Sequence, residues 1–223
     1  MRPLDGRTSR NQTTSVSNTI DRREHWGQVH RTKGPEEVSW FQANPMCSIE
    51  LIDRFCPRMD ARIVDIGGGI SRLVDTLLER GRSRVTVLDV SAEALSHTRM
   101  RLGQRARDVC WVQDDVVAAD LGGPFDLWHD RAVFHFLTDE TDREKYAQKV
   151  HACLVEGGHA VVATFAEDGP EKCSGLPVVR YSAASLHETL GAGRFSLVHE
   201  LRTVHVTPQG KEQKFQFAVL RRI

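Results

Sequence analysis

Two spacings of hydrophobic residues alternate along the chain, and each predicts a different kind of element. Short, nearly continuous apolar runs rich in β-branched residues occupy 61–66 and 84–88, which is typical of strands buried on both faces of a sheet. Helical spacing follows each run, at 72–80 and 92–104. From residue 60 onward this alternation predicts an α/β domain, a parallel sheet with helices on both faces.

The same alternation continues through the middle of the chain. Two helices are expected there. The first, at 139–154, is closed by a turn at Gly157 and Gly158, and the second, at 182–190, ends at Gly191. The predicted strands of this region are 109–112, 125–129 and 159–165.

The last two predicted strands are long and alternate polar with apolar residues. They occupy 195–206 and 212–221 and are joined by Thr207-Pro208-Gln209-Gly210, a cluster of turn residues. A connection this short joins antiparallel neighbours. The sequence therefore predicts a terminal antiparallel hairpin.

The N-terminal region differs from the rest in composition. Residues 1–20 are rich in Ser, Thr, Asn and Arg and nearly free of large apolar side chains, so we expect a flexible tail. A transit peptide or residues added for expression are alternatives, although Asp5 and the missing amphipathic stripe weigh against the former. We expect residues 21–59 to form a helical segment ahead of a domain at 60–223.

Composition narrows the functional classes. The 223 residues fit one domain and a tail, and 30 basic against 30 acidic residues favour neither nucleic acid nor acidic membrane as a partner. No apolar run approaches the roughly 20 residues that span a bilayer. Five cysteines without a C-x-x-C pair indicate a reduced, cytoplasmic protein with no disulfide framework and no zinc or other metal site.

Candidate chemistry begins at the end of the first predicted strand. Asp65 precedes a cluster of Gly67, Gly68 and Gly69, and Asp89 ends the second strand. Glycines let the backbone turn tightly and approach a ligand closely. A carboxylate about 20 residues further on is placed to bind ribose hydroxyls. The pattern predicts a nucleoside-cofactor site, whereas the simplest alternative is a plain strand-to-helix turn.

The residue before the glycines decides between cofactors. Asp65 would repel the pyrophosphate of a dinucleotide, and the last glycine of the G-x-G-x-x-G fingerprint would fall on Arg72. S-adenosylmethionine (SAM) has no phosphate, and its sulfonium and ammonium groups tolerate a carboxylate. These features favour SAM over NAD(P).

Asp-x-Gly-x-Gly after one strand and an acid after the next resembles the class I SAM-dependent methyltransferases, with Ser71 where many members have a third glycine. Serine is a good helix N-cap, so this change is mild. The resemblance covers residues 62–223. It implies a Rossmann-like, seven-stranded, mostly parallel sheet with a terminal antiparallel hairpin, and SAM as the cofactor with S-adenosylhomocysteine (SAH) as its product.

The resemblance also implies an adenine site after the third strand. In the family an acid here commonly bonds the adenine amino group, and a backbone N–H binds a ring nitrogen. Asp115, followed by Val116, aligns better than Asp114, although either acid could instead cap a turn. The expected cofactor-binding residues are Asp65, Gly67, Gly68, Gly69, Asp89, Val90, Asp114, Asp115, Val116, His129 and Trp40.

The segment after the fourth strand is the expected place of the methionine end of SAM and of the acceptor. Ligands of open α/β sheets lie outside the carboxyl ends of strands, which places His129, Asp130, Arg131 and His135 in the right region. We expect Asp130 and His135 to be catalytic, with His135 as a general base. A histidine packed under the next helix is the alternative. The Asn-Pro-Pro-Tyr mark of amide-nitrogen methylation is absent.

Two further segments are candidates for enclosing the site. Trp26, followed by Glu36-Glu37-Val38-Ser39-Trp40-Phe41-Gln42, resembles the N-terminal segment of lysine methyltransferases acting on citrate synthase and elongation factors. There it covers the cofactor, which implies this role for Trp26, Trp40 and Gln42; an amphipathic helix at the sheet edge is the alternative.

The long loop at 165–181 is the second of these segments. Long loops in compact domains are usually functional or disordered. The expected substrate-binding residues are Trp26 and three residues of this loop, Cys173, Arg180 and Tyr181. A structural role for the loop residues is the alternative.

Two acceptor classes follow from this interpretation. A small molecule bearing a thiol, hydroxyl, amine or carboxylate is favoured, because the chain is compact and has no separate recognition domain. A protein lysine is the alternative, although Asp130-Arg131-Ala132-Val133 departs from the Asp-Lys-Gly-Thr of the lysine enzymes. More remote alternatives are a non-catalytic SAM-binding module and an NAD(P)-dependent oxidoreductase. We expect a monomer or homodimer.

Overall fold

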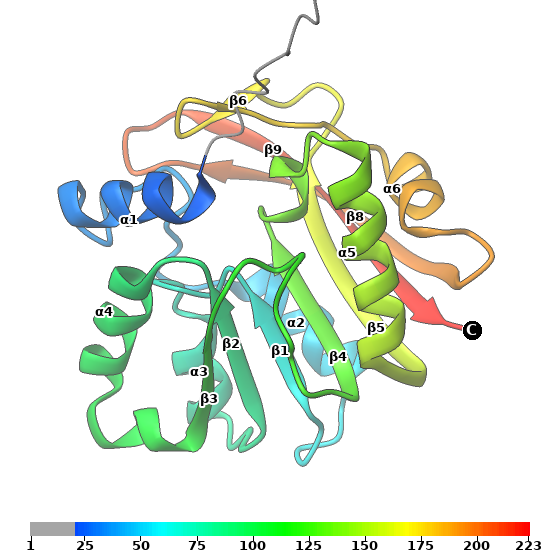
Figure 1. The fold of residues 1–223 in the computed structure, drawn as a ribbon, viewed down its shortest axis with the longest axis horizontal. Coiled ribbons are helices and arrows are strands. Elements are labelled where there is room, and N and C mark those ends of the chain that lie inside the picture. Colours follow the sequence, from blue (N-terminus) through cyan, green and yellow to red (C-terminus); the bar gives the residue numbers. More distant parts are fainter. Residues whose placement is uncertain (1–20) are drawn as a thin grey trace, which may run out of the picture.

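A computed structural model describes residues 21–223, in which a seven-stranded sheet lies between two layers of helices (Figure 1). The strand order is β3-β2-β1-β4-β5-β9-β8. The first five strands are mutually parallel, and β9 runs antiparallel to both β5 and β8. The predicted α/β fold with its terminal hairpin is confirmed, while the tail predicted at 1–20 lies outside the described residues.

The helices and strands follow the predicted order. The helices are α1 (Arg22–Thr32), α2 (Met46–Phe55), α3 (Leu73–Glu79), α4 (Ala92–Leu102), α5 (Glu140–Cys153) and α6 (Ala183–Leu190). The strands of the main sheet are β1 (Ile63–Ile66), β2 (Val85–Asp89), β3 (Val109–Gln113), β4 (Phe125–Arg131), β5 (Leu154–Phe165), β8 (Phe195–Val206) and β9 (Glu212–Arg222). Two short 3₁₀ helices lie at Gly103–Asp108 and Phe134–Phe136.

Several element ends differ from the predicted ones. No turn separates α5 from β5, because β5 begins at Leu154 and carries Gly157 and Gly158 as an irregularity within the strand. A Cβ at Gly158 would lie 2.9 Å from the carbonyl oxygen of Val155, so only glycine fits there. The loop predicted after β5 contains a small hairpin of β6 (Lys172–Cys173) and β7 (Leu176–Pro177).

The ends of two helices test the predicted caps. Ser91 caps α4 as expected, since its Oγ accepts a hydrogen bond from the backbone of Ala94 at 3.2 Å. Helix α3 begins at Leu73 and its N-cap position is Arg72, one residue after the predicted Ser71. Ser71 still serves this end, because its Oγ accepts from the Leu73 N–H at 3.1 Å.

The sheet has a hydrophobic core on each face. Helices α5 and α6 bury Tyr146 and Leu186 against one face. Helices α2, α3 and α4 bury residues such as Ile52, Leu77 and Leu95 against the other. Because helices pack on both faces of the sheet, the core fixes the positions of the carboxyl ends of the parallel strands.

The structure divides the segment predicted as a lid into two parts. Helix α2 belongs to the domain core, where Ile49 and Ile52 pack in the same cluster as Ile63 of β1. Helix α1 lies at the carboxyl ends of the strands and packs near α4 (Figure 1). Of residues 21–59, α1 and the loop that contains Trp40 line the first cavity, whereas α2 reaches the second cavity through Ser48.

Candidate active site

Two adjoining cavities open at the carboxyl ends of β1, β2 and β4, where the strand order reverses between β1 and β4. Open α/β sheets bind ligands at such a point. The first cavity encloses about 780 Å³ of empty space, part of it open to solvent. Trp40, Gly67 and Arg131 line both cavities. Of the predicted site residues, the first cavity is lined by Trp26, Trp40, Gly67, Asp89, Val90, Asp114, Asp115, Val116 and Cys173.

The glycine cluster forms the floor between the two cavities. The Gly67 N–H donates to the carbonyl of Leu88 at 2.7 Å, which draws the loop against the end of β2. Gly67 has a φ of 65°, and a Cβ there would collide with Val133. A Cβ on Gly68 would collide with the carboxylate of Asp65. The loop thus depends on glycine for its conformation and for its close approaches.

Asp89 is fixed by the backbone around it. Its carboxylate accepts from the Ser91 N–H at 2.8 Å and from the Gly69 N–H at 3.0 Å. Burial raises the pKa of Asp89 to about 6. Gly69 lines neither cavity, so its contribution is to hold Asp89 at the cavity wall.

Asp65 ends a buried chain of hydrogen bonds that crosses from the sheet to α2. His129 Nδ1 lies 2.7 Å from one carboxylate oxygen of Asp65, and His129 Nε2 lies 2.8 Å from Ser48 Oγ. The three residues are at most 3% exposed. The second oxygen of Asp65 is buried without a hydrogen-bond partner, and all three residues line the second cavity. A buried, unsatisfied carboxylate oxygen suits a cationic ligand group.

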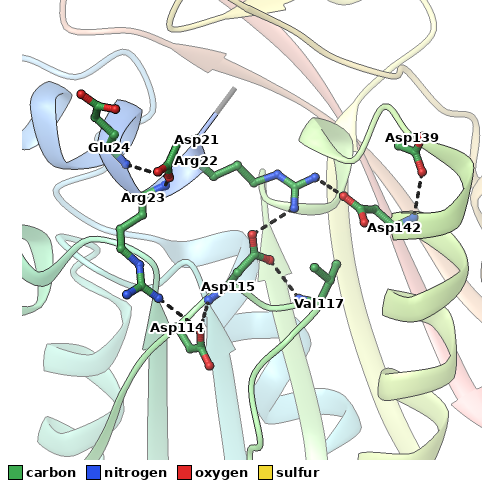
Figure 2. A network of polar contacts seen from close by, with 9 residues as sticks. All are labelled: Asp21, Arg22, Arg23, Glu24, Asp114, Asp115, Val117, Asp139 and Asp142. Atoms are coloured by element: carbon green, nitrogen blue, oxygen red, sulfur yellow. Dashed lines mark hydrogen bonds and ion pairs between the residues drawn. The ribbon is translucent and has the colours of Figure 1, made fainter. Parts of the chain in front are cut away.

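The predicted adenine acids hold α1 in place (Figure 2). Asp115 accepts from Arg22 at 3.0 Å with one oxygen and from the Val117 N–H at 3.0 Å with the other. The other arm of Arg22 donates to Asp142 on α5. Arg23 reaches Asp114 at 3.3 Å. These ion pairs fasten the first helix across the mouth of the first cavity.

An aromatic cluster forms the apolar wall of the first cavity. Trp26 makes edge-on contacts with Trp40 and Phe136, at ring-centre distances of 5.5 and 5.0 Å. His30 lies 6.0 Å from Trp40, and burial lowers the pKa of His30 to about 4. This wall is therefore uncharged near neutral pH.

The two predicted catalytic residues do not reach either cavity. His135 is fully buried, accepts from the Phe165 N–H at 3.3 Å, and has its pKa lowered by burial to about 3. Asp130 is also fully buried, and it accepts from Tyr146 at 2.6 Å and from the Val133 N–H at 2.9 Å. The geometry favours the alternative of a packed histidine, with Asp130 holding the turn after β4.

The loop after β5 brings one of its three candidates to the cavity. Cys173 lines the first cavity, and burial raises the pKa of its thiol to about 11. Arg180 instead pairs with Glu171 at 3.4 Å. Tyr181 packs against Phe134 inside the core. Neither Arg180 nor Tyr181 lines a cavity.

The structure adds lining residues to which the sequence gave no role, including Arg131, which was expected only to lie in the region after the fourth strand. Arg131, Phe136 and Leu137 lie directly beside the expected Asp130 and His135, and strand alternation could have paired Arg131 with His129 on one face of β4. Arg22 and Ser48 gave no local signal, because their partners lie 93 and 81 residues away. The lining residues outside the predicted set are Arg22, His30, Phe41, Pro45, Ser48, Ile66, Ile70, Ser71, Leu73, Leu88, Arg131, Ala132, Val133, Phe136 and Leu137.

The described residues contain neither a candidate metal cluster nor a helix that could span a membrane. Within 21–223, no group of three or more His, Cys, Asp or Glu side chains could hold a metal ion. None of the helices in this range combines the length and apolarity needed to cross a membrane.

Sequence comparisons relate the chain to methyltransferases. Residues 64–160 match the family model described as a methyltransferase domain. The chain is also 23% identical, over 169 residues, to the eEF1A lysine and N-terminal methyltransferase of Danio rerio. That match covers 74% of this chain and about a quarter of the longer relative, 24%.

Solved structures share the fold at low identity. A structure described under the conversion of a disulfide bond into a thioacetal group during echinomycin biosynthesis superposes with a TM-score of 0.72 at 19% identity, over 90% of this chain and 92% of that one. The 1,6-didemethyltoxoflavin-N1-methyltransferase of Burkholderia thailandensis, solved with SAH, gives 0.64 at 20%, over 99% and 93%. The N-methyltransferase NodS of Bradyrhizobium japonicum, also with SAH, gives 0.63 at 16%, over 88% and 97%.

The residues present fit SAM. One carboxylate oxygen of Asp65 is unsatisfied at the second cavity and could pair with a cationic group of SAM. The glycine loop leaves space that side chains would fill, and Asp89 lies at the wall of the larger cavity. The family match and the shared fold agree with this site. The chain therefore contains a region, residues 64–160, that matches a methyltransferase domain, within a fold that it shares with methyltransferases solved with SAH.

Proposed function

We propose that the protein transfers the methyl group of SAM to a small, flat molecule. One observation carries this proposal: the aromatic wall of Trp26, Trp40 and Phe136 closes the first cavity beneath α1, which Arg22 ties to Asp115. A concave, mostly apolar cavity with a few polar groups suits a small ligand.

The cofactor roles follow from what lines each cavity. Asp89 would bind the ribose hydroxyls, and Asp114, Asp115 and Val116 would surround the adenine. The free oxygen of Asp65 would face the ammonium group of the methionine end. When bound, SAM supplies an electrophilic methyl group on a sulfonium sulfur.

The chain's contribution to the reaction is alignment. Holding two reactants in near-attack geometry can lower a barrier by about 7–11 kcal/mol. The buried His30 and the Cys173 thiol are uncharged near neutral pH. Neither is a strong base there, so we propose an acceptor that reacts without protein-assisted proton removal or arrives already deprotonated.

The names of the structural relatives agree with a small acceptor. One of them methylates N1 of a didemethyltoxoflavin, and it covers nearly the whole of this chain. At 20% identity this likeness shows the fold alone, so the acceptor class rests on the cavity.

A protein lysine is the second candidate acceptor. The eEF1A methyltransferase relative favours it, although the match spans only 24% of that protein. The segment Asp130-Arg131-Ala132-Val133, which departs from the lysine enzymes, weighs against it.

We also propose a division into residues 21–59 ahead of a SAM-binding domain at 60–223, and a cytoplasmic location as a monomer or homodimer. Supporting the location, all five cysteines are free, including the exposed Cys110.

Transfer of label from radioactive SAM in a fractionated cell extract tests the acceptor class. We expect label in the small-molecule fraction that depends on the added protein. Label confined to protein bands would refute the small acceptor and support lysine. A catalytically silent protein that still binds SAM would contradict both.

A further inference from the structure

Among residues 21–223, Arg131 is a partly buried cation without a carboxylate partner. It extends from the end of β4, and its Nη1 donates to the carbonyl oxygen of Trp40 at 3.1 Å. Its Nη2 is buried without a hydrogen-bond partner. Within residues 21–223, no carboxylate lies within 4.0 Å of this guanidinium.

Arg82, which is more deeply buried than Arg131, has several polar and charged partners. Arg82 is 2% exposed, pairs with Asp53 at 3.0 Å, and donates to the carbonyls of Cys56 and Arg58 at 2.7 Å. In the described part of the chain, the guanidinium of Arg131 contacts one carbonyl and the ring of Phe215, whose centre lies 4.5 Å from its Cζ. A cation–π contact offsets part of the cost of burying a charge, and an anion offsets far more.

Arg131 keeps its charge despite burial. Desolvation lowers the pKa of Arg131 to about 10, which leaves the guanidinium protonated near neutral pH. Within the described residues, the guanidinium of Arg131 therefore carries an unpaired positive charge near neutral pH. A buried charge of this kind is costly unless something pairs with it.

The position of Arg131 relates the charge to the acceptor. It lines both cavities, with Cys173 of the loop after β5 on the wall of the first. The aromatic cluster of Trp26, Trp40 and Phe136 lines the same space. Flat apolar walls beside one unpaired cation match a flat aromatic ring that carries a negative charge.

We propose that Arg131 binds a negatively charged group of the methyl acceptor, and that the acceptor is therefore an aromatic acid. This inference rests on the proposed transfer to a small molecule and narrows its substrate class. A guanidinium binds planar oxyanions through charge-assisted hydrogen bonds. The carboxylate of SAM itself is the other source of such an anion, but Asp65 and the glycine loop already provide for the methionine end in the second cavity.

Binding of matched acid and amide probes tests this proposal on the full chain with SAH bound. The probes are benzoate, 2-naphthoate and quinoline-2-carboxylate with their amides, followed by tryptophan fluorescence. We expect at least one acid to bind ten-fold or more tightly than its amide. Arg131→Gln should abolish that preference, and Arg131→Lys should retain part of it. SAH affinity should change less than three-fold in both variants.

The outcomes separate this inference from the proposed function. If the wild-type protein binds no SAH, the proposed function fails. If it binds SAH but no acid exceeds its amide, only the role of Arg131 fails. A loss of SAH affinity in Arg131→Gln, with affinity for 5′-methylthioadenosine unchanged, would assign Arg131 to the cofactor carboxylate and overturn the proposal. Should Arg131→Gln not fold, the wild-type preference and the Lys variant decide.

Discussion

Arg22 and Asp115 lie 93 residues apart in the chain and meet at 3.0 Å over the mouth of the larger cavity. Arg22 comes from the first helix, and Asp115 follows β3. The same guanidinium also reaches Asp142 of α5, so one side chain joins three elements (Figure 2). The predicted adenine acid thus also anchors the helix that covers the site.

Removing this anchor should loosen α1. Both side chains are about a quarter exposed, at 26% and 24%, so we expect Arg22→Ala to cost about 1 kcal/mol per ion pair and to weaken SAH binding several-fold. Calorimetric titration and hydrogen exchange in α1 measure both effects. Arg23→Ala is the control, because Arg23 is 58% exposed and should change SAH affinity little. Equal effects of the two variants would contradict an anchoring role.

Cofactor affinity should depend on pH through Asp89. Its pKa is raised to about 6, and in the proposed site the ribose hydroxyls would donate to the ionised carboxylate. SAH affinity should therefore fall as the pH drops below about 6. Asp89→Asn should bind SAH more weakly at neutral pH and lose this pH dependence. Titrations between pH 5 and pH 8 at roughly half-unit steps check this. An unchanged pH profile in the variant would remove Asp89 from the ribose role.

The same carboxyl should affect stability in the opposite direction. A buried acid whose pKa rises on folding contributes stability below its unfolded value of 3.8, and this is lost as the pH rises through about 6. Asp130 shows the same shift. The SAH-free wild type should lose more melting temperature between pH 5 and pH 7 than Asp89→Asn does. Asp130→Asn should share this flattening yet keep the pH dependence of SAH binding.

Gly67→Ala should damage the cofactor loop. The new Cβ would meet Val133 at a backbone φ of 65°, so overpacking adds to conformational strain. We expect a loss of about 2–4 kcal/mol in unfolding free energy or of ten-fold or more in SAH affinity. Gly103→Ala separates the two causes, because its φ is 58° with nothing within 4 Å of the added Cβ. If denaturant unfolding showed equal losses of unfolding free energy in Gly67→Ala and Gly103→Ala, the collision with Val133 would contribute nothing.

His135 should be dispensable for chemistry. Its ring lies inside the core between Phe136 and Phe165, at ring-centre distances of 4.5 and 4.7 Å. In a folded His135→Leu variant we expect methyl transfer within about three-fold of wild type and the same pH–rate profile, since a general base typically contributes 10²–10⁴-fold. A loss of activity by a hundred-fold with SAH affinity intact would restore His135 as the base.

The places of the proposed cofactor residues were predictable because they depend on local sequence. Asp65, the glycines and Asp89 occupy consecutive strand ends, and neighbouring parallel strands bring such ends to one edge of the sheet. The positions of the residues proposed to bind the acceptor were not predictable. Whether Cys173 or Tyr181 reaches the cavity depends on how the loop after β5 packs, and the sequence pattern gives both residues the same standing.

By itself, the sequence determined the α/β order, the terminal hairpin and the choice of SAM, because periodicity, turn residues and the charge of Asp65 act over short stretches of chain. Only the tertiary structure decided that α2 is core, that His135 is buried, that Arg22 fastens α1, and that Arg131 has no carboxylate partner within residues 21–223. Those properties depend on contacts between residues far apart in the chain, and no local pattern encodes such contacts.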